Sequence, residues 1–160
     1  MFETVNKLLE QYIGGQIFFT ELDKAVKFDR HILEQLIHKI KEEYAEDVKT
    51  IASGEIGLAM HNLGVQVDFL VPGGLRHDPS KINLAPFVDK IKGQKFVFVD
   101  DSYFSGRTAY VVQEEIEKLG GIFIGSVVAY DGAKHRDYMV DSLYRYYDHH
   151  DVLGRPKIRV

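Results

Sequence analysis

The chain has 160 residues, of which 45% are hydrophobic and 28% charged, with a formal net charge of −4 and no cysteine. This length and composition fit one folded domain and exclude a disordered chain, a disulfide framework and a thiolate metal site. No apolar run reaches the roughly 20 residues that span a bilayer, and the N-terminus has no secretory signal, so we expect a cytoplasmic protein. The negative charge gives no reason to expect a nucleic-acid partner, and we expect no membrane partner.

The N-terminal part predicts two helices separated by a hairpin. Apolar residues recur at helical spacing near the start of the chain and again between residues 29 and 44, where Asp29 is placed to cap the helix. Between them, two short apolar runs flank the tetrapeptide Glu21-Leu22-Asp23-Lys24, which is the pattern of a β-hairpin. We therefore expect helices at 1–11 and 29–44 and strands at 17–20 and 25–28.

The middle of the chain alternates strand and helix patterns. Runs of β-branched and aromatic residues are separated by turns or by segments with helical spacing. In chain order we expect a strand at 48–52, a turn at 53–57, a helix at 58–63, a strand at 65–71, a polar stretch at 72–92 with a weak helical pattern near 87–91, a strand at 95–99, a helix at 107–119 and a strand at 122–130. This order predicts an α/β domain with a parallel sheet flanked by helices, which binds ligands at the carboxyl ends of its strands.

Two acids and a run of hydroxyl residues follow the strand at 95–99. Asp100 and Asp101 would lie at the carboxyl edge of the sheet, where adjacent carboxylates repel each other and normally need a ligand or cation. Three hydroxyl residues and a glycine then lead into the next helix, namely Ser102, Ser105, Gly106 and Thr108. Hydroxyls and backbone N–H groups at a helix N-terminus hold phosphate, so the segment indicates a ribose 5-phosphate. Taken singly, the same residues also occur as ordinary caps of a helix, so the composition leaves helix capping open as an alternative.

The segment from Phe96 to Thr108 resembles the signature with which type I phosphoribosyltransferases bind 5-phosphoribosyl 1-diphosphate (PRPP). That signature has four hydrophobic residues, two acids, a short variable stretch and then Ser/Thr-Gly-x-Thr. The resemblance implies that Asp100 and Asp101 bind the ribose 2′- and 3′-hydroxyls. The residues that it places around the 5′-phosphate are Ser102, Tyr103, Phe104, Ser105, Gly106, Arg107 and Thr108.

Three other segments resemble the family less closely. Residues 50–57 are similar to its first strand and pyrophosphate loop, which implies that Ser53, Gly54 and Glu55 hold the diphosphate; an ordinary strand–helix turn is the alternative. The stretch 72–92 lies where the family has a mobile loop. The resemblance therefore implies three catalytic residues that would neutralise the leaving pyrophosphate: Arg76, His77 and Lys81. A solvated surface loop is the alternative there. Residues 18–30 resemble the hood of orotate-type members, with Lys24 and Lys27 implied in binding the base.

The resemblance implies one phosphoribosyltransferase-like domain over residues 1–160, with a helical and hairpin hood at 1–46, a core at 47–131 and a C-terminal extension at 132–160. The extension contains an aromatic stretch from Tyr144 to Asp151 with two adjacent histidines. Adjacent histidines cannot easily face one ion on a regular element, so we predict no protein-built metal site. We expect the aromatic residues to pack onto the sheet or onto a second subunit.

These features lead to a functional hypothesis. The resemblance implies a PRPP-dependent glycosyltransferase of nucleotide metabolism, which joins C1 of the ribose to a nitrogenous base, releases pyrophosphate, uses Mg²⁺ and forms a homodimer. The N-terminal resemblance favours an orotate-like pyrimidine as the base. Phe104 and Glu55 favour the alternative, a non-catalytic regulatory protein that binds PRPP or a nucleotide. Purine-type members carry an acid at the position of Phe104, and Glu55 would place a negative charge beside the diphosphate. An unrelated α/β fold that binds another phosphorylated ligand is a third hypothesis.

Overall fold

The computed structural model describes residues 30–64, 67–71 and 82–157. In chain order its elements are α3 (Arg30–Glu43), β1 (Lys49–Ser53), α4 (Gly54–Asn62), β2 (Phe69–Val71), the 3₁₀ turn η2 (Ala85–Phe87), α5 (Val88–Ile91), β3 (Lys95–Tyr103), α6 (Arg107–Lys118), β4 (Ile122–Asp131), β5 (Val140–Arg145) and α7 (Tyr146–His149). No helix among these residues is long and apolar enough to cross a membrane.

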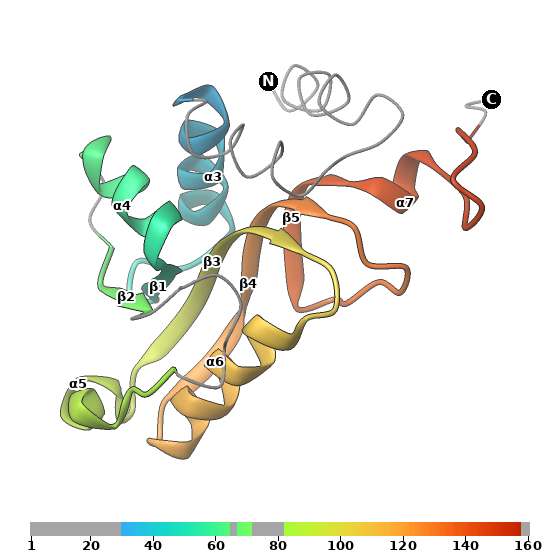
Figure 1. The fold of residues 1–160 in the computed structure, drawn as a ribbon. Helices are drawn as coiled ribbons and strands as arrows, with labels where there is room; N and C mark the ends of the chain where they lie inside the picture. The colour runs from blue at the N-terminus through green and yellow to red at the C-terminus, as the bar shows by residue number, and fades with distance from the viewer. Residues whose placement is uncertain (1–29, 65–66, 72–81, 158–160) are drawn as a thin grey trace.

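The five strands form one parallel sheet in the order β2-β1-β3-β4-β5. β3 lies at the centre and pairs with β1 and β4 on its two sides. Because every strand runs in the same direction, all five carboxyl ends lie at one edge of the sheet (Figure 1). The parallel α/β architecture predicted from the sequence is therefore confirmed.

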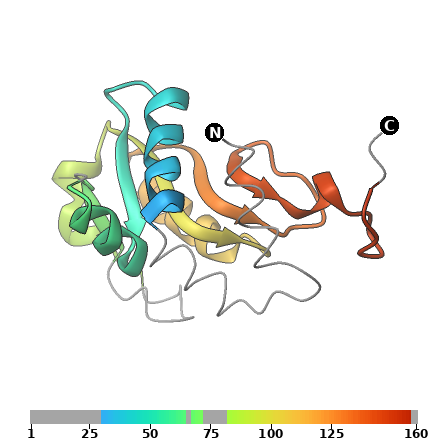
Figure 2. The same ribbon diagram turned by 90° about the horizontal axis from the view of Figure 1, so that it is seen from above.

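Helices cover both faces of the sheet (Figures 1 and 2). Consecutive side chains of a strand point to opposite faces, so Val97 and Val99 of β3 pack under α3 and α4, whereas Phe96 and Phe98 pack under α5 and α6. All four side chains are at most 1% exposed. The near-continuous apolar run of β3 follows from burial on both faces.

Most predicted elements appear close to their expected positions. The predicted helix at 29–44 corresponds to α3, the strand at 48–52 to β1, the helix at 107–119 to α6 and the strand at 122–130 to β4. The weak helical pattern near 87–91 corresponds to η2 and α5. The predicted strand at 65–71 is shorter, since β2 covers only Phe69–Val71 within the described residues. The helix at 1–11 and the hairpin at 17–28 lie outside them.

Two predictions about element boundaries are wrong. The turn expected at 53–57 is the first part of α4, which begins at Gly54. Gly57 permits this, because a Cβ at that position would collide with the Leu70 side chain of β2 and lie 3.2 Å from the Cβ of Ala52, and the glycine therefore lets α4 approach β1 and β2 closely. The strand expected to end at Val99 continues to Tyr103, since its polar end still pairs with β4 as far as Asp131.

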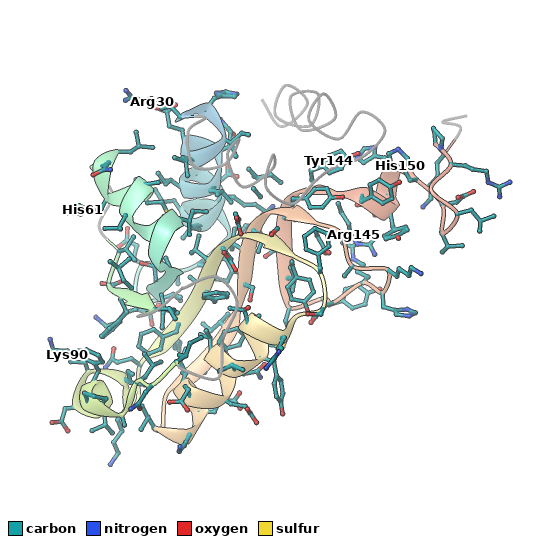
Figure 3. All side chains as sticks on the ribbon, viewed as in Figure 1. Arg30, His61, Lys90, Tyr144, Arg145 and His150 are labelled. Carbon is teal, nitrogen blue, oxygen red and sulfur yellow. The ribbon has the colours of Figure 1, made fainter. Side chains whose placement is uncertain are left out.

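The C-terminal extension contributes the fifth strand. β5 pairs with β4 from Val140 to Arg145, and Tyr144 is 1% exposed in the core. The expectation that the aromatic residues pack onto the sheet is confirmed for Tyr144, which stacks on Tyr130 with 5.8 Å between ring centroids. The strand was not predicted, because its pattern has only a few strongly apolar residues. Tyr144 and Arg145 lie at the carboxyl edge, far from Lys90 on α5 (Figure 3).

Candidate functional site

The two adjacent acids lie near the carboxyl end of the central strand. Asp100 and Asp101 are part of β3, so their side chains point to opposite faces of the sheet. Asp101 is 9% exposed and its Oδ1 accepts a hydrogen bond from the Ser102 hydroxyl at 3.3 Å. Asp100 is half-buried and its Oδ1 accepts the backbone N–H of Asp101 at 2.8 Å. Two carboxylates are thus held by the sheet at the edge where parallel α/β proteins bind their ligands.

A short loop joins β3 to α6. Only residues 104–106 separate the two elements, so Ser102 and Tyr103 belong to the strand and Arg107 and Thr108 to the helix. Gly106 is the N-cap residue of α6 and has a left-handed conformation with φ of 77°, which a glycine adopts without strain. The Ser105 hydroxyl accepts the backbone N–H of Arg107 at 3.4 Å. We call residues 102–108 the phosphate loop, after the role that the sequence predicts for them. The backbone N–H groups at the start of the twelve-residue helix α6 form the kind of end that attracts anions.

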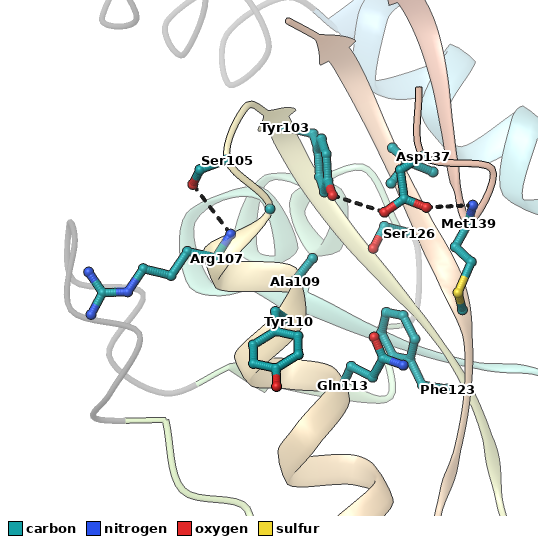
Figure 4. A pocket seen from close by; sticks show the side chains of 12 residues that line it. Tyr103, Ser105, Arg107, Ala109, Tyr110, Gln113, Phe123, Ser126, Asp137 and Met139 are labelled. Atoms are coloured by element: carbon teal, nitrogen blue, oxygen red, sulfur yellow. Dashed lines mark hydrogen bonds between the residues drawn. The ribbon is translucent and has the colours of Figure 1, made fainter. Parts of the chain in front are cut away.

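Tyr103 connects the phosphate loop by hydrogen bonds to residues 132–139, the segment that precedes β5. Its hydroxyl donates a hydrogen bond to Oδ2 of Asp137 at 3.0 Å (Figure 4). Its carbonyl oxygen accepts the N–H of Gly132 at 2.9 Å. Burial, followed by the hydrogen bond and charge of Asp137, raises the pKa of Tyr103 to about 12. The tyrosine ring also lies over Gly106, where a Cβ would collide with the hydroxyl. Glycine is therefore required at this position by the backbone and by the neighbouring ring.

Phe104 packs onto the end of β4. Its ring lies 5.6 Å from that of Tyr130 between centroids, and a Cβ at Gly132 would lie 2.5 Å from it. The side chain is 38% exposed. Phe104 therefore makes an apolar contact that holds the loop against the end of β4.

Asp131 and Arg145 form an ion pair at the ends of β4 and β5. Arg145 Nε lies 3.7 Å from Oδ2 of Asp131, and the two side chains are 12% and 2% exposed. Burial raises the pKa of Asp131, outweighing the N–H of Ala133 and the charge of Arg145, which lower it. Arg145 also donates to Asp148 at 3.2 Å and to the carbonyl oxygens of Ala133 and Lys134. The sequence interpretation missed this arginine because the strand that carries it was missed.

Two cavities adjoin the phosphate loop. One, of about 350 Å³, lies between α6 and β4 and is lined by Tyr110, Gln113 and Ser126 (Figure 4). The other, of about 580 Å³, lies between the loop and residues 133–139. Tyr103 and Asp137 line both cavities, so their hydrogen bond lies at the boundary between them.

The other predicted site residues are placed only in part. In the pairing of β1 with β3, Ala52 lies opposite Val99, so Ser53 at the end of β1 and Gly54 at the start of α4 lie at the same edge as Asp100. Glu55 follows in the first turn of α4. The predicted catalytic and base-binding residues, Arg76, His77, Lys81, Lys24 and Lys27, lie outside the described residues. Within the described part of the chain, no group of three or more His, Cys, Asp and Glu side chains is arranged to hold a metal ion.

Solved structures with similar folds are phosphoribosyltransferases. The orotate phosphoribosyltransferase of Mycobacterium tuberculosis, in complex with inorganic phosphate, has a TM-score of 0.57 and 15% sequence identity over 92% of this chain and 89% of that chain. A phosphoribosyltransferase from Corynebacterium diphtheriae has a TM-score of 0.56 and 12% identity over 91% and 98%. The adenine phosphoribosyltransferase of Thermoanaerobacter pseudethanolicus has a TM-score of 0.51 and 21% identity over 82% and 90%.

The chain therefore has the type I phosphoribosyltransferase fold, as its sequence led us to expect. The sequence itself matches no protein-family model and no curated protein. At these identities the similarity defines the fold, and it includes structures named for both pyrimidine and purine bases.

Proposed function

We propose that the chain is a PRPP-dependent phosphoribosyltransferase that joins C1 of ribose to a nitrogenous base and releases pyrophosphate. The observation that supports this most strongly is the position of Asp100 and Asp101. They lie near the carboxyl end of the central strand and are followed within a few residues by Gly106 and the N-terminus of α6. In that arrangement, carboxylates that accept hydrogen bonds from sugar hydroxyls lie beside a cradle that donates hydrogen bonds to a phosphate.

The residues of the phosphate loop would bind and orient the sugar. Asp100 and Asp101 would accept from the 2′- and 3′-hydroxyls, and the hydroxyls of Ser105 and Thr108 with the loop N–H groups would bind the 5′-phosphate. Ser53 and Gly54, beside Asp100 at the end of β1, would lie next to the diphosphate. Holding both ends of the sugar fixes C1 relative to the base, which lowers the entropic barrier of the reaction.

The oxygen donors near Asp100 also fit Mg²⁺. Mg²⁺ takes carboxylate and phosphate oxygens and usually keeps few protein ligands, so the carboxylate of Asp100 or of Asp101 would hold the ion together with oxygens of the ligand. When bound, Mg²⁺ would supply positive charge that neutralises the diphosphate.

The acceptor is proposed to be an orotate-like pyrimidine. Phe104 supports a base other than a 6-oxopurine, because a phenyl ring cannot handle a proton at a purine ring nitrogen and here it packs on Tyr130. The same residue also supports the second candidate, a regulatory protein that binds PRPP or a nucleotide without turnover. A homodimer is part of the proposal from the family resemblance.

Release of pyrophosphate from Mg-PRPP, measured against orotate, uracil, adenine, hypoxanthine and guanine, tests the proposal. We expect turnover with one class of base, orotate first, and its loss in Asp100→Asn/Asp101→Asn. The matched control Asp47→Asn/Asp89→Asn removes two exposed carboxylates from the region of the opposite edge and should keep the activity. PRPP binding without turnover on any base would support the regulatory alternative, and absence of PRPP binding would contradict both. Sedimentation of the same sample tests the homodimer.

A further inference from the structure

The larger cavity beside the phosphate loop has two chemically different walls. One wall is the loop itself, with Tyr103, Phe104 and the Ser105 hydroxyl. The other is formed by residues 133–139, the connection between β4 and β5, which contributes three consecutive side chains that carry or can accept positive charge: Lys134, His135 and Arg136. The Ser105 hydroxyl of the phosphate loop thus faces a cationic segment across one cavity of about 580 Å³.

The backbone of this cationic segment is fixed from two sides. Arg145 donates to the carbonyl oxygens of Ala133 at 3.3 Å and Lys134 at 3.5 Å. On the other side, Asp137 accepts the N–H of Met139 at 2.9 Å through Oδ1 and the Tyr103 hydroxyl at 3.0 Å through Oδ2. The connection is therefore fastened both to β5 and to the phosphate loop.

Positive charge prevails on this wall. Asp137 is the one acidic residue that lines the cavity among the described residues, and both of its oxygens accept hydrogen bonds within the connection and loop. Lys134 and His135 are exposed side chains that point from a fixed backbone. Arg136 is 56% exposed, lies 3.8 Å from Asp148 and stands 5.5 Å above the ring of Tyr138.

We propose that residues 134–136 are a second wall of the phosphate site, and that Lys134 and Arg136 contribute binding energy to the sugar's 5′-phosphate from the side opposite the loop. The Tyr103–Asp137 hydrogen bond keeps this wall at a fixed distance from the loop. A phosphate monoester carries close to two negative charges at neutral pH, more than one helix N-terminus neutralises. Side-chain cations from a second element supply the remainder. This inference rests on the proposed function, since it takes the loop to be the phosphate site.

Calorimetric binding of ribose 5-phosphate to Lys134→Gln/Arg136→Gln tests the second wall. We expect the affinity to fall about tenfold or more, because two charged groups that bind the phosphate are lost. The control Lys90→Gln/Lys118→Gln removes two exposed lysines from α5 and α6, away from the cavity, and should change it less than about twofold. Added salt should weaken binding to the wild type more steeply than to the cavity variant.

Two further measurements separate this inference from the proposed function. Tyr103→Phe keeps both cations but removes the hydrogen bond that holds residues 134–136 at a fixed distance from the loop. It should therefore weaken ribose 5-phosphate binding when introduced alone and have little further effect when added to Lys134→Gln/Arg136→Gln. Equal affinity of the wild type and the cavity variant would overturn the second wall and leave the proposed function standing. Weaker binding of Mg-PRPP with unchanged binding of ribose 5-phosphate would also overturn it, because the cations would then face the diphosphate. A wild type that binds neither ligand would refute the proposed function and the inference with it.

Discussion

The guanidinium of Arg145 lies 3.7 Å from the carboxylate of Asp131, and the two side chains connect the last two strands of the sheet where those strands end. Because Asp131 is 2% exposed, its charge is separated from water and depends on this partner. We expect Arg145→Met to lower the free energy of unfolding by about 3 kcal/mol, measured by urea denaturation. Adding Asp131→Asn should recover a large part of the loss, since it removes the unpaired charge.

Arg155 provides the matched control for that prediction. Its Nε lies only 2.8 Å from Asp151, but the arginine side chain is 72% exposed. Arg155→Met should therefore cost less than about 1 kcal/mol despite the shorter distance. If the two arginine variants were equally destabilised, burial would not be what makes the Asp131–Arg145 pair important.

The hydrogen bond between Tyr103 and Asp137 predicts a dependence on alkaline pH. The folded state raises the pKa of Tyr103 from 10.0 to about 12, so it favours the neutral phenol. The stability that this contributes is complete below pH 10 and is lost as the pH rises toward 12. The difference in unfolding free energy between the wild type and Tyr103→Phe should thus be constant from pH 7 to 9 and shrink above pH 10. A difference that is the same at pH 8 and pH 11.5 would contradict the assignment.

The contact between Phe104 and Gly132 predicts a coupling between loop and sheet. A methyl group at Gly132 would lie 2.5 Å from the Phe104 ring and 2.9 Å from the Tyr130 ring, so Gly132→Ala must displace an aromatic side chain. We expect it to cost about 1–3 kcal/mol of unfolding free energy and to weaken ribose 5-phosphate binding. In a Phe104→Ala background, the cost of the same methyl group should be smaller. An identical cost in both backgrounds would show that Phe104 does not restrict this position.

The central part of the fold could be predicted because its sequence patterns agree with one another. The apolar run from Phe96 to Val99 is buried on both faces, and the helix after Gly106 begins and ends close to where its pattern predicts. The acids and the phosphate loop were placed correctly at the carboxyl edge of the sheet. Their secondary structure was predicted less well, because pairing with β4 extends β3 through polar residues up to Tyr103.

The remaining parts of the site depend on contacts between residues far apart in the sequence. Tyr103 is part of the predicted signature, but nothing in the sequence links it to Asp137, because their separation of 34 residues gives no local pattern. Arg145 lies on a strand whose alternation is weak, so its pairing with Asp131 follows only from the neighbouring register of β4 and β5. In the sequence, residues 134–136 look like any polar connection between two strands. Only the contacts of Tyr103 and Arg145 show that this segment lies opposite the phosphate loop.

The central claim is that Asp100 and Asp101 bind the sugar of PRPP, and calorimetry with Mg-PRPP tests it most directly. We expect the wild type and Asp47→Asn/Asp89→Asn to bind with the same affinity, whereas Asp100→Asn/Asp101→Asn, with an unchanged circular dichroism spectrum, should lose binding by about a hundredfold or more. Undiminished affinity in the folded Asp100→Asn/Asp101→Asn variant would contradict the account.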